Sequence, residues 1–270
     1  MPPNVLIILG LAGLAFLAIG LAWAWRATPA RTPHDLILHI IGRVYARVFH
    51  GLSISGREHI PAQHAPGPLI VLANHTAGVD PILIASACPF HIRWVMAQDM
   101  RAKRLEWLWK WQDVIFVSRS GRDRRAVREA LRHLDQGGVI GIFPEGSLER
   151  PAKQIRPFRR GVGVLIHRSR ARVLPVVIEG TPQVDPAWAS LWRPSRSRVR
   201  VHEIIDYTST DLSGAEIAED LRQKFLAWTG WPANDEPRAR TGVDEGDKAK
   251  GRPVVAQTEE RSAGRESNAA

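Results

Sequence analysis

The stretch from Leu69 to Ala87, LIVLANHTAGVDPILIASA, contains a short apolar run, a polar segment and a second apolar segment in succession. Leu69–Ala73 has the length and the continuous apolar character of a buried strand, and the segment through Ala87 has a helical pattern. A strand followed by a helix is the repeating unit of α/β domains. The stretch therefore predicts the fold class, and its polar segment, Asn74–Asp80, falls where the strand ends.

The same alternation continues along the chain. Short apolar runs recur as VIFV, VIGIF, LPVVI and VRVHEII, at residues 114–117, 139–143, 174–178 and 199–205. Between the first two lies RDRRAVREALRHLDQGG, a predicted helix with a strongly basic face and an apolar stripe formed by Ala126, Val127, Ala130, Leu131 and Leu134. We therefore expect an α/β domain over residues 52–232, with a central, largely buried sheet flanked by helices.

An apolar segment without charged side chains precedes this domain, from Val5 to Trp25. As a helix it would be roughly 32 Å long at about 1.5 Å per residue, enough to cross a hydrocarbon core of about 30 Å. A cleaved signal peptide is the alternative, but the four residues before the run lack Lys and Arg. Tryptophans and then arginines follow the run, which favours a cytoplasmic end. We expect one transmembrane helix over residues 5–25, a single-pass inner-membrane location and a cytoplasmic domain.

Two further segments flank the predicted domain. Residues 35–51 carry apolar side chains at helical spacing with Arg43 and Arg47 opposite, so this amphipathic helix either lies on lipid headgroups or packs on the domain. The alternating Trp107, Trp109 and Trp111 leave a similar choice between an interfacial belt and half-buried packing. Residues 233–270 have little apolar periodicity, which predicts a disordered tail.

Charge and cysteine content narrow the function. The net charge is +10, so an anionic partner is expected, and the basic helix face is either solvated or a site for anionic headgroups or an acidic carrier protein. A single cysteine, Cys88, permits no internal disulfide and no site of several thiolates. We find no P-loop, G-x-S-x-G, H-E-x-x-H or dinucleotide motif, which argues against nucleotide hydrolysis, serine esterase chemistry and zinc proteolysis.

His75 and Asp80 are the candidate chemical pair. A neutral imidazole can remove a hydroxyl proton, and a carboxylate can orient the ring. On a regular helix the two residues would be rotated by about 140° from each other, so a turn must bring them together, and Gly78 offers backbone freedom. No serine or cysteine is suitably placed nearby, so the substrate's own alcohol would be the nucleophile. The alternative is a surface histidine near a helix-capping aspartate.

Four polar segments follow the predicted strands, and together they carry a family resemblance. NHTAGVD, VIFVSR, FPEGS and LPVVIEGT resemble, in content, order and spacing, the glycerolipid acyltransferase family, which includes lysophosphatidic acid acyltransferases. The family's H-x4-D matches His75 and Asp80, and its F-P-E-G-[ST] matches Phe143–Ser147. The resemblance covers about residues 52–205. The sequence departs from the usual pattern at Ala77, often serine, and at Ser147-Leu148, often threonine and arginine.

The resemblance implies transfer of a fatty acyl group from acyl-CoA or acyl-carrier protein to the hydroxyl of a lysophospholipid, with 1-acyl-glycerol-3-phosphate giving phosphatidic acid. It implies the following roles: His75 as general base, Asp80 as its orienting partner, and Arg119, Glu145, Gly146 and Ser147 as substrate-binding residues. Arg119 offers a fork for phosphate, whereas Glu145 would repel phosphate and is better suited to orient Arg119 or a glycerol hydroxyl.

Other acceptors and one other class of function stay open. The acceptor could instead be glycerol 3-phosphate or a lyso-aminolipid. A non-catalytic, membrane-tethered module that binds anionic lipid through its basic face is the other class. The expected partners are membrane lipids, the acyl donor and the lysophospholipid acceptor, without nucleic acid, metal or bound redox cofactor.

Overall fold

A seven-stranded sheet lies at the centre of the computed structural model, which describes residues 2, 5, 12–16, 18–20, 22, 32–118 and 123–236. The strands are β1 (Ser53–Ser55), β2 (Leu69–Ala73), β3 (Arg93–Ala97), β4 (Ile115–Val117), β5 (Val139–Ile142), β6 (Arg172–Glu179) and β7 (Arg198–Val201). The α-helices among the described residues that bear on the fold are α2 (Pro33–Val48), α3 (Asp80–Ala87), α4 (Glu106–Trp111), α5 (Arg124–Asp135), α6 (Arg160–Ser169) and α7 (Gly214–Thr229). The 3₁₀ helices are η1 (Arg57–His59), η2 (Gln98–Met100), η3 (Lys103–Leu105) and η4 (Ala187–Trp192).

The strand order is β1-β7-β6-β2-β5-β3-β4. Neighbouring strands are parallel except β6 and β7, which pair antiparallel. The predicted α/β class with a central sheet is confirmed, and the sheet is mixed. Because β6, β2 and β5 are parallel neighbours, their carboxyl ends lie at one edge, where ligands of open α/β sheets bind.

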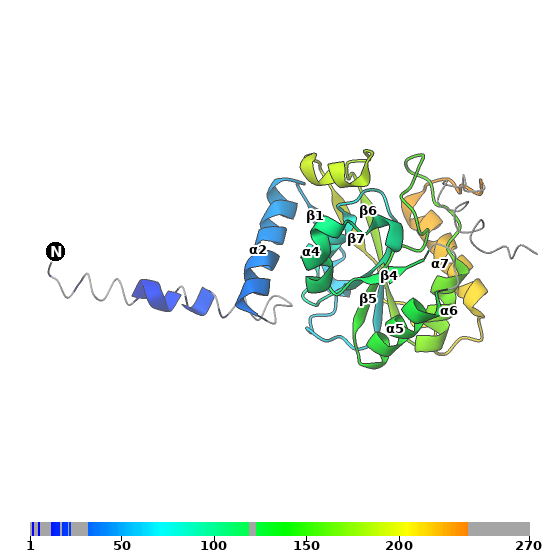
Figure 1. Ribbon diagram of the computed structural model, residues 1–270. Coiled ribbons are helices and arrows are strands. Elements are labelled where there is room, and N and C mark those ends of the chain that lie inside the picture. The colour runs from blue at the N-terminus through cyan, green and yellow to red at the C-terminus, as the bar shows by residue number, and fades with distance from the viewer. Residues whose placement is uncertain are drawn as a thin grey trace, which may run out of the picture. The chain divides into compact units, whose positions relative to one another are not determined.

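Helices cover both faces of the sheet. Strand β2 shows why, since all five of its residues are buried and successive side chains point to opposite faces. Leu69 and Val71 pack in a cluster with residues of α2 and α3, whereas Ile70 and Leu72 pack with residues of α5, α6 and α7. Figure 1 shows α2 and α4 on one side of the sheet and α5, α6 and α7 on the other.

Two strands and one helix position differ from the sequence expectations. Strands β1 and β3 were not expected, because β1 has only three residues and β3 begins with a charged one, Arg93.

In α5, Ala126, Ala130 and Leu134 are buried as expected, at a spacing of four residues. Val127, expected in the same stripe, is 41% exposed because it lies beside this row rather than on it.

The N-terminal segments are described only in part. The anchor expected over residues 5–25 lies largely outside the described residues and stays a prediction. Within the residues that the structure describes, no helix combines the length and the apolar character needed to cross a bilayer. The helix expected at residues 35–51 is observed as α2; it begins at Pro33 because Thr32 and Asp35 form a capping box, with N–H to side-chain distances of 2.9 and 3.1 Å.

The folded domain extends slightly beyond its expected C-terminal boundary. Ala233 forms a bridge with Ile155, the N–H of Asn234 donates to the Ile155 carbonyl at 3.0 Å, and Asp235 pairs with Arg222. The first compact unit accordingly ends at Asp235 rather than at residue 232. Residues 237–270 of the expected tail lie outside the described residues.

A close contact between α6 and α7 gives a testable prediction. A Cβ atom added at Gly163 would lie 1.7 Å from the Gly214 carbonyl oxygen, so the two helices approach through glycine. Gly163→Ala should lower the free energy of unfolding by about 1 to 3 kcal/mol, because the helices must separate. At Gly161, in the same helix, a Cβ meets nothing within 4 Å. Gly161→Ala is the control and should stabilise by up to about 1 kcal/mol. Equal melting temperatures for the two variants would contradict the close packing.

Candidate active site

The segments that follow β2, β5 and β6 meet at the carboxyl edge of the sheet. Asn74, directly after β2, is buried; its side-chain amide donates to the Ile178 carbonyl at 3.0 Å and accepts from the Ile178 N–H at 2.8 Å. The hydroxyl groups of Thr76 and Thr181 are hydrogen-bonded to each other. These contacts hold the β2 and β6 segments together and fix the start of the His75–Asp80 turn.

Asp80 is the centre of that turn. Its carboxylate is fully buried, and Oδ2 accepts the backbone N–H groups of Thr76 at 2.7 Å and Ala77 at 2.8 Å. Asp80 is also the first residue of α3, where the helix dipole favours negative charge. His75 Nδ1 lies 3.0 Å from the same oxygen. The expected meeting of His75 and Asp80 is therefore observed.

Gly78 is needed for a different reason from the one expected. A Cβ atom at this position would lie 2.5 Å from the carbonyl oxygen of Ala187, the first residue of η4. Gly78 is not among the residues with a left-handed backbone. Close approach of another segment, rather than special backbone freedom, excludes a side chain here.

The contact with Asp80 determines which ring nitrogen of His75 donates a hydrogen bond and which can accept a proton. A carboxylate only accepts hydrogen bonds, so Nδ1 donates, and in the neutral ring Nε2 keeps its lone pair. The His75 side chain is 19% exposed, whereas that of Asp80 is 0% exposed. The pair thus combines a buried carboxylate with an imidazole that substrate can reach, which suits removal of a hydroxyl proton.

Two aromatic rings hold the imidazole plane. The rings of His75 and Phe143 stack at 3.9 Å with an interplanar angle of 14°, and Phe143 stacks on Trp94 at 5.0 Å and 11°. Stacking of flat rings limits rotation of the imidazole away from Asp80. From the sequence, Phe143 is only a member of a motif, and Trp94 was not expected at the site, because nothing local marks a residue of β3 as a neighbour of the segment after β5.

Glu145 and Gly146 belong to the loop after β5, and Glu145 contacts the His75–Asp80 turn. Glu145 is fully buried; Oε1 accepts the His75 N–H at 3.4 Å, and Oε2 accepts the Arg156 N–H at 3.2 Å. Gly146 has a positive φ of 68°, and a Cβ atom there would lie 2.2 Å from Arg159 Nε. Ser147 follows and is partly buried. Of the expected substrate-binding residues, Arg119 lies outside the described residues.

Glu149 is a second buried glutamate, and its place at the site was not expected from the sequence. The N–H of Glu149 donates to the His75 carbonyl at 2.6 Å, and its Oε1 accepts the Gln154 N–H at 2.8 Å. Its Oε2 is buried without a hydrogen-bond partner among the described residues. Burial, with smaller contributions from the charges of Glu145 and Asp80, raises the pKa of Glu149 to about 8. The carboxyl group is therefore protonated at neutral pH.

Arg150 lies in the loop after β5 and connects it to the loops that follow β2 and β6. Its Nη1 donates to the carbonyl of Thr76 at 3.1 Å, and its Nη2 donates to the carbonyl of Val184 at 3.3 Å. A carboxylate oxygen of Asp185 lies 3.4 Å from Nε. Arg150 was not expected from the sequence; the local signal is its place three residues after the F-P-E-G-S block.

The arrangement supplies an oriented imidazole, and within the part of the chain that the structure describes no serine or cysteine side chain is hydrogen-bonded to it. The Thr76 hydroxyl is hydrogen-bonded to the Asp80 carboxylate and to the Thr181 hydroxyl. Among the described residues, no cluster of three or more His, Cys, Asp or Glu side chains is placed to hold a metal ion. A hydroxyl group on the substrate would complete the reaction centre.

Comparisons with known proteins agree with the motifs. Residues 51–179 match the family model described as Acyltransferase. A 1-acyl-sn-glycerol-3-phosphate acyltransferase of Borreliella burgdorferi is 31% identical over 134 residues, 47% of this chain and 51% of that protein. An N-acylphosphatidylethanolamine synthase of Arabidopsis thaliana is 30% identical, covering 45% and 48%. The chain thus spans about half the length of these curated relatives.

A solved structure shares the fold. It is the crystal structure of the 1-acyl-sn-glycerophosphate (LPA) acyltransferase, PlsC, from Thermotoga maritima, with a TM-score of 0.58, 21% identity, and coverage of 93% of this chain and 98% of that chain. The fold, the family model over the segment that holds the His75–Asp80 pair, and the matching relatives lead to one conclusion. Residues 51–179 match the acyltransferase family model, and over about half of its length the chain is similar to glycerolipid acyltransferases.

Proposed function

We propose that this protein transfers a fatty acyl group from acyl-CoA or acyl-carrier protein to the hydroxyl of 1-acyl-glycerol-3-phosphate and forms phosphatidic acid. The observation that carries the proposal is the 3.0 Å contact between His75 Nδ1 and Asp80 Oδ2 inside an acyltransferase domain. Two curated relatives, from Borreliella burgdorferi and Bacillus subtilis, are 1-acyl-sn-glycerol-3-phosphate acyltransferases.

The proposed reaction is a direct transfer. His75 Nε2 removes the proton of the acceptor hydroxyl as the oxygen attacks the thioester carbonyl. Asp80 keeps the ring oriented and stabilises the imidazolium that forms. The tetrahedral intermediate then expels the thiolate, which takes the proton from His75, and an ester and a free thiol result. No acyl-enzyme forms, because the acceptor itself is the nucleophile.

The acceptor phosphate is assigned to Arg119, whose guanidinium can donate two parallel hydrogen bonds. Ser147 and the backbone at Gly146 are assigned to the glycerol part, since a left-handed glycine lets the chain approach a ligand closely. Glu145 is assigned an indirect part in acceptor binding, because both of its carboxylate oxygens accept backbone N–H groups.

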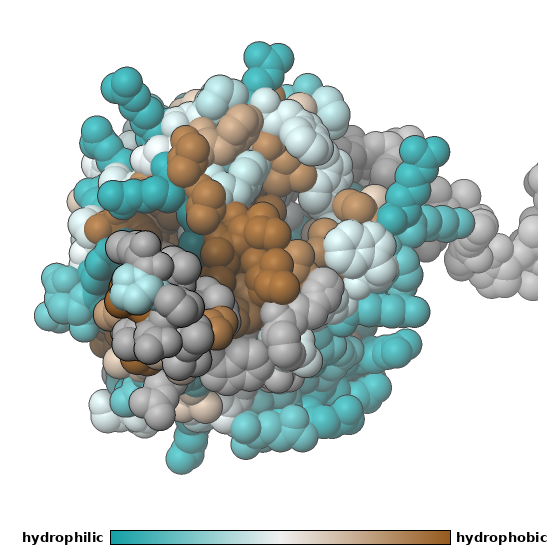
Figure 2. Space-filling model, turned by 90° about the vertical axis from the view of Figure 1, so that its left-hand side faces the viewer, coloured by the Kyte–Doolittle hydropathy of each residue, from teal (hydrophilic) through white to brown (hydrophobic). Residues whose placement is uncertain are grey.

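We place the catalytic domain on the cytoplasmic side of the inner membrane, with α2 at the lipid surface. Hydrophobic side chains gather on the face that carries α2, bordered by hydrophilic ones (Figure 2). Within α2, Ile37 is 58% exposed and Val48 is 78% exposed, although Leu36 and Ala46 are buried against the domain. Trp107 of α4 is also exposed, and Trp111 Nε1 donates to Asp35 of α2 at 2.6 Å. Such a face favours the interfacial interpretation of this helix.

An amine acceptor is the second candidate. The observation in its favour is the similarity to the Arabidopsis thaliana N-acylphosphatidylethanolamine synthase. That protein is 30% identical to this chain, against 31% for the Borreliella burgdorferi acyltransferase. An oriented imidazole can remove a proton from an attacking amine as well as from a hydroxyl.

Thiol release from acyl-CoA and from acyl-carrier protein tests the proposal. The purified full chain is assayed with 1-acyl-glycerol-3-phosphate, glycerol 3-phosphate, lysophosphatidylethanolamine and phosphatidylethanolamine as separate acceptors, and lipid products are identified by mass spectrometry. We expect 1-acyl-glycerol-3-phosphate to give the fastest thiol release and a stoichiometric amount of phosphatidic acid. Faster release with an amine lipid would support the second candidate, and release that no acceptor changes would contradict both.

A further inference from the structure

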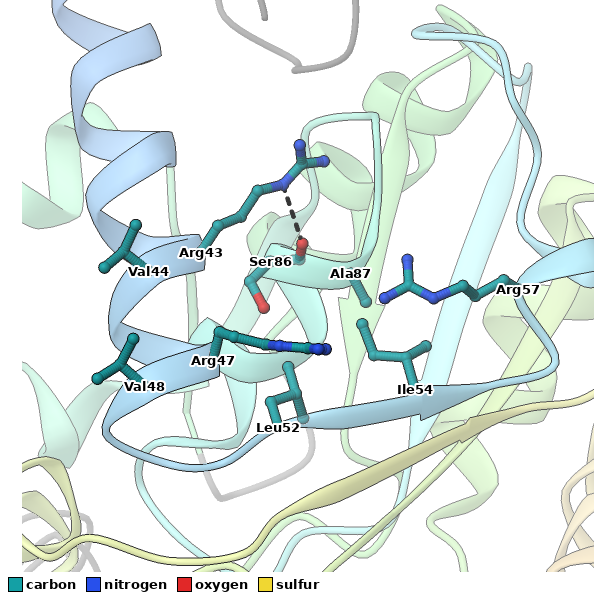
Figure 3. Close-up of a pocket in the computed structure, with 9 residues that line it drawn as sticks. All are labelled: Arg43, Val44, Arg47, Val48, Leu52, Ile54, Arg57, Ser86 and Ala87. Carbon is teal, nitrogen blue, oxygen red and sulfur yellow. Dashed lines mark hydrogen bonds between the residues drawn. The ribbon is translucent and has the colours of Figure 1, made fainter.

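A cavity of about 410 Å³ lies between α2, the β1 region and the end of α3. We call it the α2–α3 cavity. Its lining residues come from α2, from the segment around β1 and η1, and from the end of α3: Arg43, Val44, Arg47, Val48, Leu52, Ile54, Arg57, Ser86 and Ala87. Figure 3 shows Arg43 and Arg47 extending from α2 into this space, with Arg57 extending toward them from the opposite side. Cationic groups from two separate segments thus converge on one cavity.

The charge of the cavity wall is entirely positive. Three arginines line it, and no acidic side chain is among its lining residues. Arg43 Nε donates to the Ser86 carbonyl at 3.2 Å, which places the guanidinium at the C-terminal end of α3. Burial and the charge of Arg57 lower the pKa of Arg43 from its ordinary value. An anion in the cavity would relieve this repulsion, and phosphate matches the planar donors of guanidinium.

The rest of the wall is apolar. Val44, Val48, Leu52, Ile54 and Ala87 contribute hydrocarbon to the cavity. Val44 and Val48 also belong to the exposed apolar face of α2, at 55% and 78% exposure. The cavity is therefore continuous with the surface assigned to the lipid. A small inorganic anion would leave the apolar wall uncovered, whereas an amphipathic anion would cover both kinds of surface.

The cavity is separate from the reaction centre. Asp80 is the first residue of α3, whereas Ser86 and Ala87, which line the cavity, are its last two. Six or seven residues of α-helix span about 10 Å at 1.5 Å per residue. A ligand held by Arg47 and Arg57 would therefore lie at the far end of α3 from the His75–Asp80 pair.

We propose that the α2–α3 cavity binds the headgroup phosphate of an anionic membrane phospholipid, with the lipid's hydrocarbon against Val44, Val48, Leu52 and Ile54. The lipid is a resident ligand that orients the domain on an anionic bilayer, and it is neither the acyl donor nor the acceptor. Positive charge facing the headgroups and apolar side chains facing the acyl region match the two parts of such a lipid.

The test measures lipid binding, not turnover. The full chain in non-ionic detergent micelles is titrated with short-chain phosphatidylglycerol or phosphatidylcholine, and bound lipid is counted by native mass spectrometry. Arg47→Gln/Arg57→Gln should weaken phosphatidylglycerol binding by about 25-fold, since each arginine near a lipid surface contributes roughly fivefold. The matched control, Arg128→Gln/Arg132→Gln, removes the same charge from the exposed face of α5 and should bind like the wild type.

Further measurements separate this proposal from its competitors. His75→Ala should keep full phosphatidylglycerol binding, so loss of the proposed reaction leaves this result unaffected. Equal weakening in the α5 control would show general charge attraction and contradict a site. Equal binding of phosphatidylcholine, or displacement of the lipid by inorganic phosphate at a similar concentration, would also overturn the proposal.

Discussion

Replacing His75 by alanine is expected to lower kcat by about 10² to 10⁴, the usual contribution of a positioned general base. The reason lies in the geometry of the pair. Nδ1 contacts a buried carboxylate at 3.0 Å, and Phe143 stacks on the ring at 3.9 Å, so the imidazole is held with Nε2 as its proton acceptor. Alanine removes the base while the backbone contacts of residue 75 with Glu145 and Glu149 can persist. The measurement is thiol release at saturating acceptor and donor.

The control for this prediction is a histidine elsewhere in the domain. His167 lies exposed on α6, so His167→Ala removes an imidazole without touching the reaction centre. It should retain the wild-type kcat. The melting temperature of His75→Ala should stay close to the wild-type value, which excludes misfolding as the cause of lost turnover. A folded His75→Ala protein with wild-type turnover would refute the role of His75 as base.

Replacing Glu149 by glutamine is expected to change how stability depends on pH. Burial raises the pKa of this carboxyl from 4.5 to about 8, so the folded protein holds a proton that the unfolded chain releases between these values. Stability therefore falls as pH rises from about 4.5 to about 8, and the loss is complete above that range. The whole pKa shift corresponds to a change of at most about 5 kcal/mol in the free energy of unfolding. Glutamine keeps an oxygen for the Gln154 N–H and carries no proton to lose.

We expect Glu149→Gln to be more stable than the wild type by about 2 to 4 kcal/mol above pH 8, and similar to it near pH 4.5. Urea unfolding across this pH range measures the difference. Glu203→Gln removes an exposed carboxylate and is the matched control; its profile should run parallel to that of the wild type. Parallel profiles for Glu149→Gln and the wild type would mean that Glu149 is not buried in its neutral form.

Short-range patterns predicted the units from which the fold is built. The apolar run Leu69–Ala73 and the helical segment after it are observed as β2 and α3, and the predicted basic helix is observed as α5. The meeting of His75 with Asp80 was also predictable. The two residues are separated by only five positions, and one turn at the start of a helix can bring them together.

Contacts between distant segments were not predictable in the same way. The stack of His75, Phe143 and Trp94 joins the regions of β2, β5 and β3. Glu149 is buried where the loop after β5 packs against the His75–Asp80 turn. The three arginines of the α2–α3 cavity come from α2 and η1. In the sequence each of these residues has the appearance of an ordinary aromatic or charged side chain.

The sequence by itself determined the α/β class, the resemblance to acyltransferases and the contact between His75 and Asp80, because these depend on periodicity and on motifs within a few residues of each other. The tertiary structure alone decided which loops surround that pair, which glutamates are buried and where the cationic cavity forms. The physical reason is that burial and electrostatic environment are set by neighbours in space. The strand order brings together β2, β5 and β6, which are far apart along the chain.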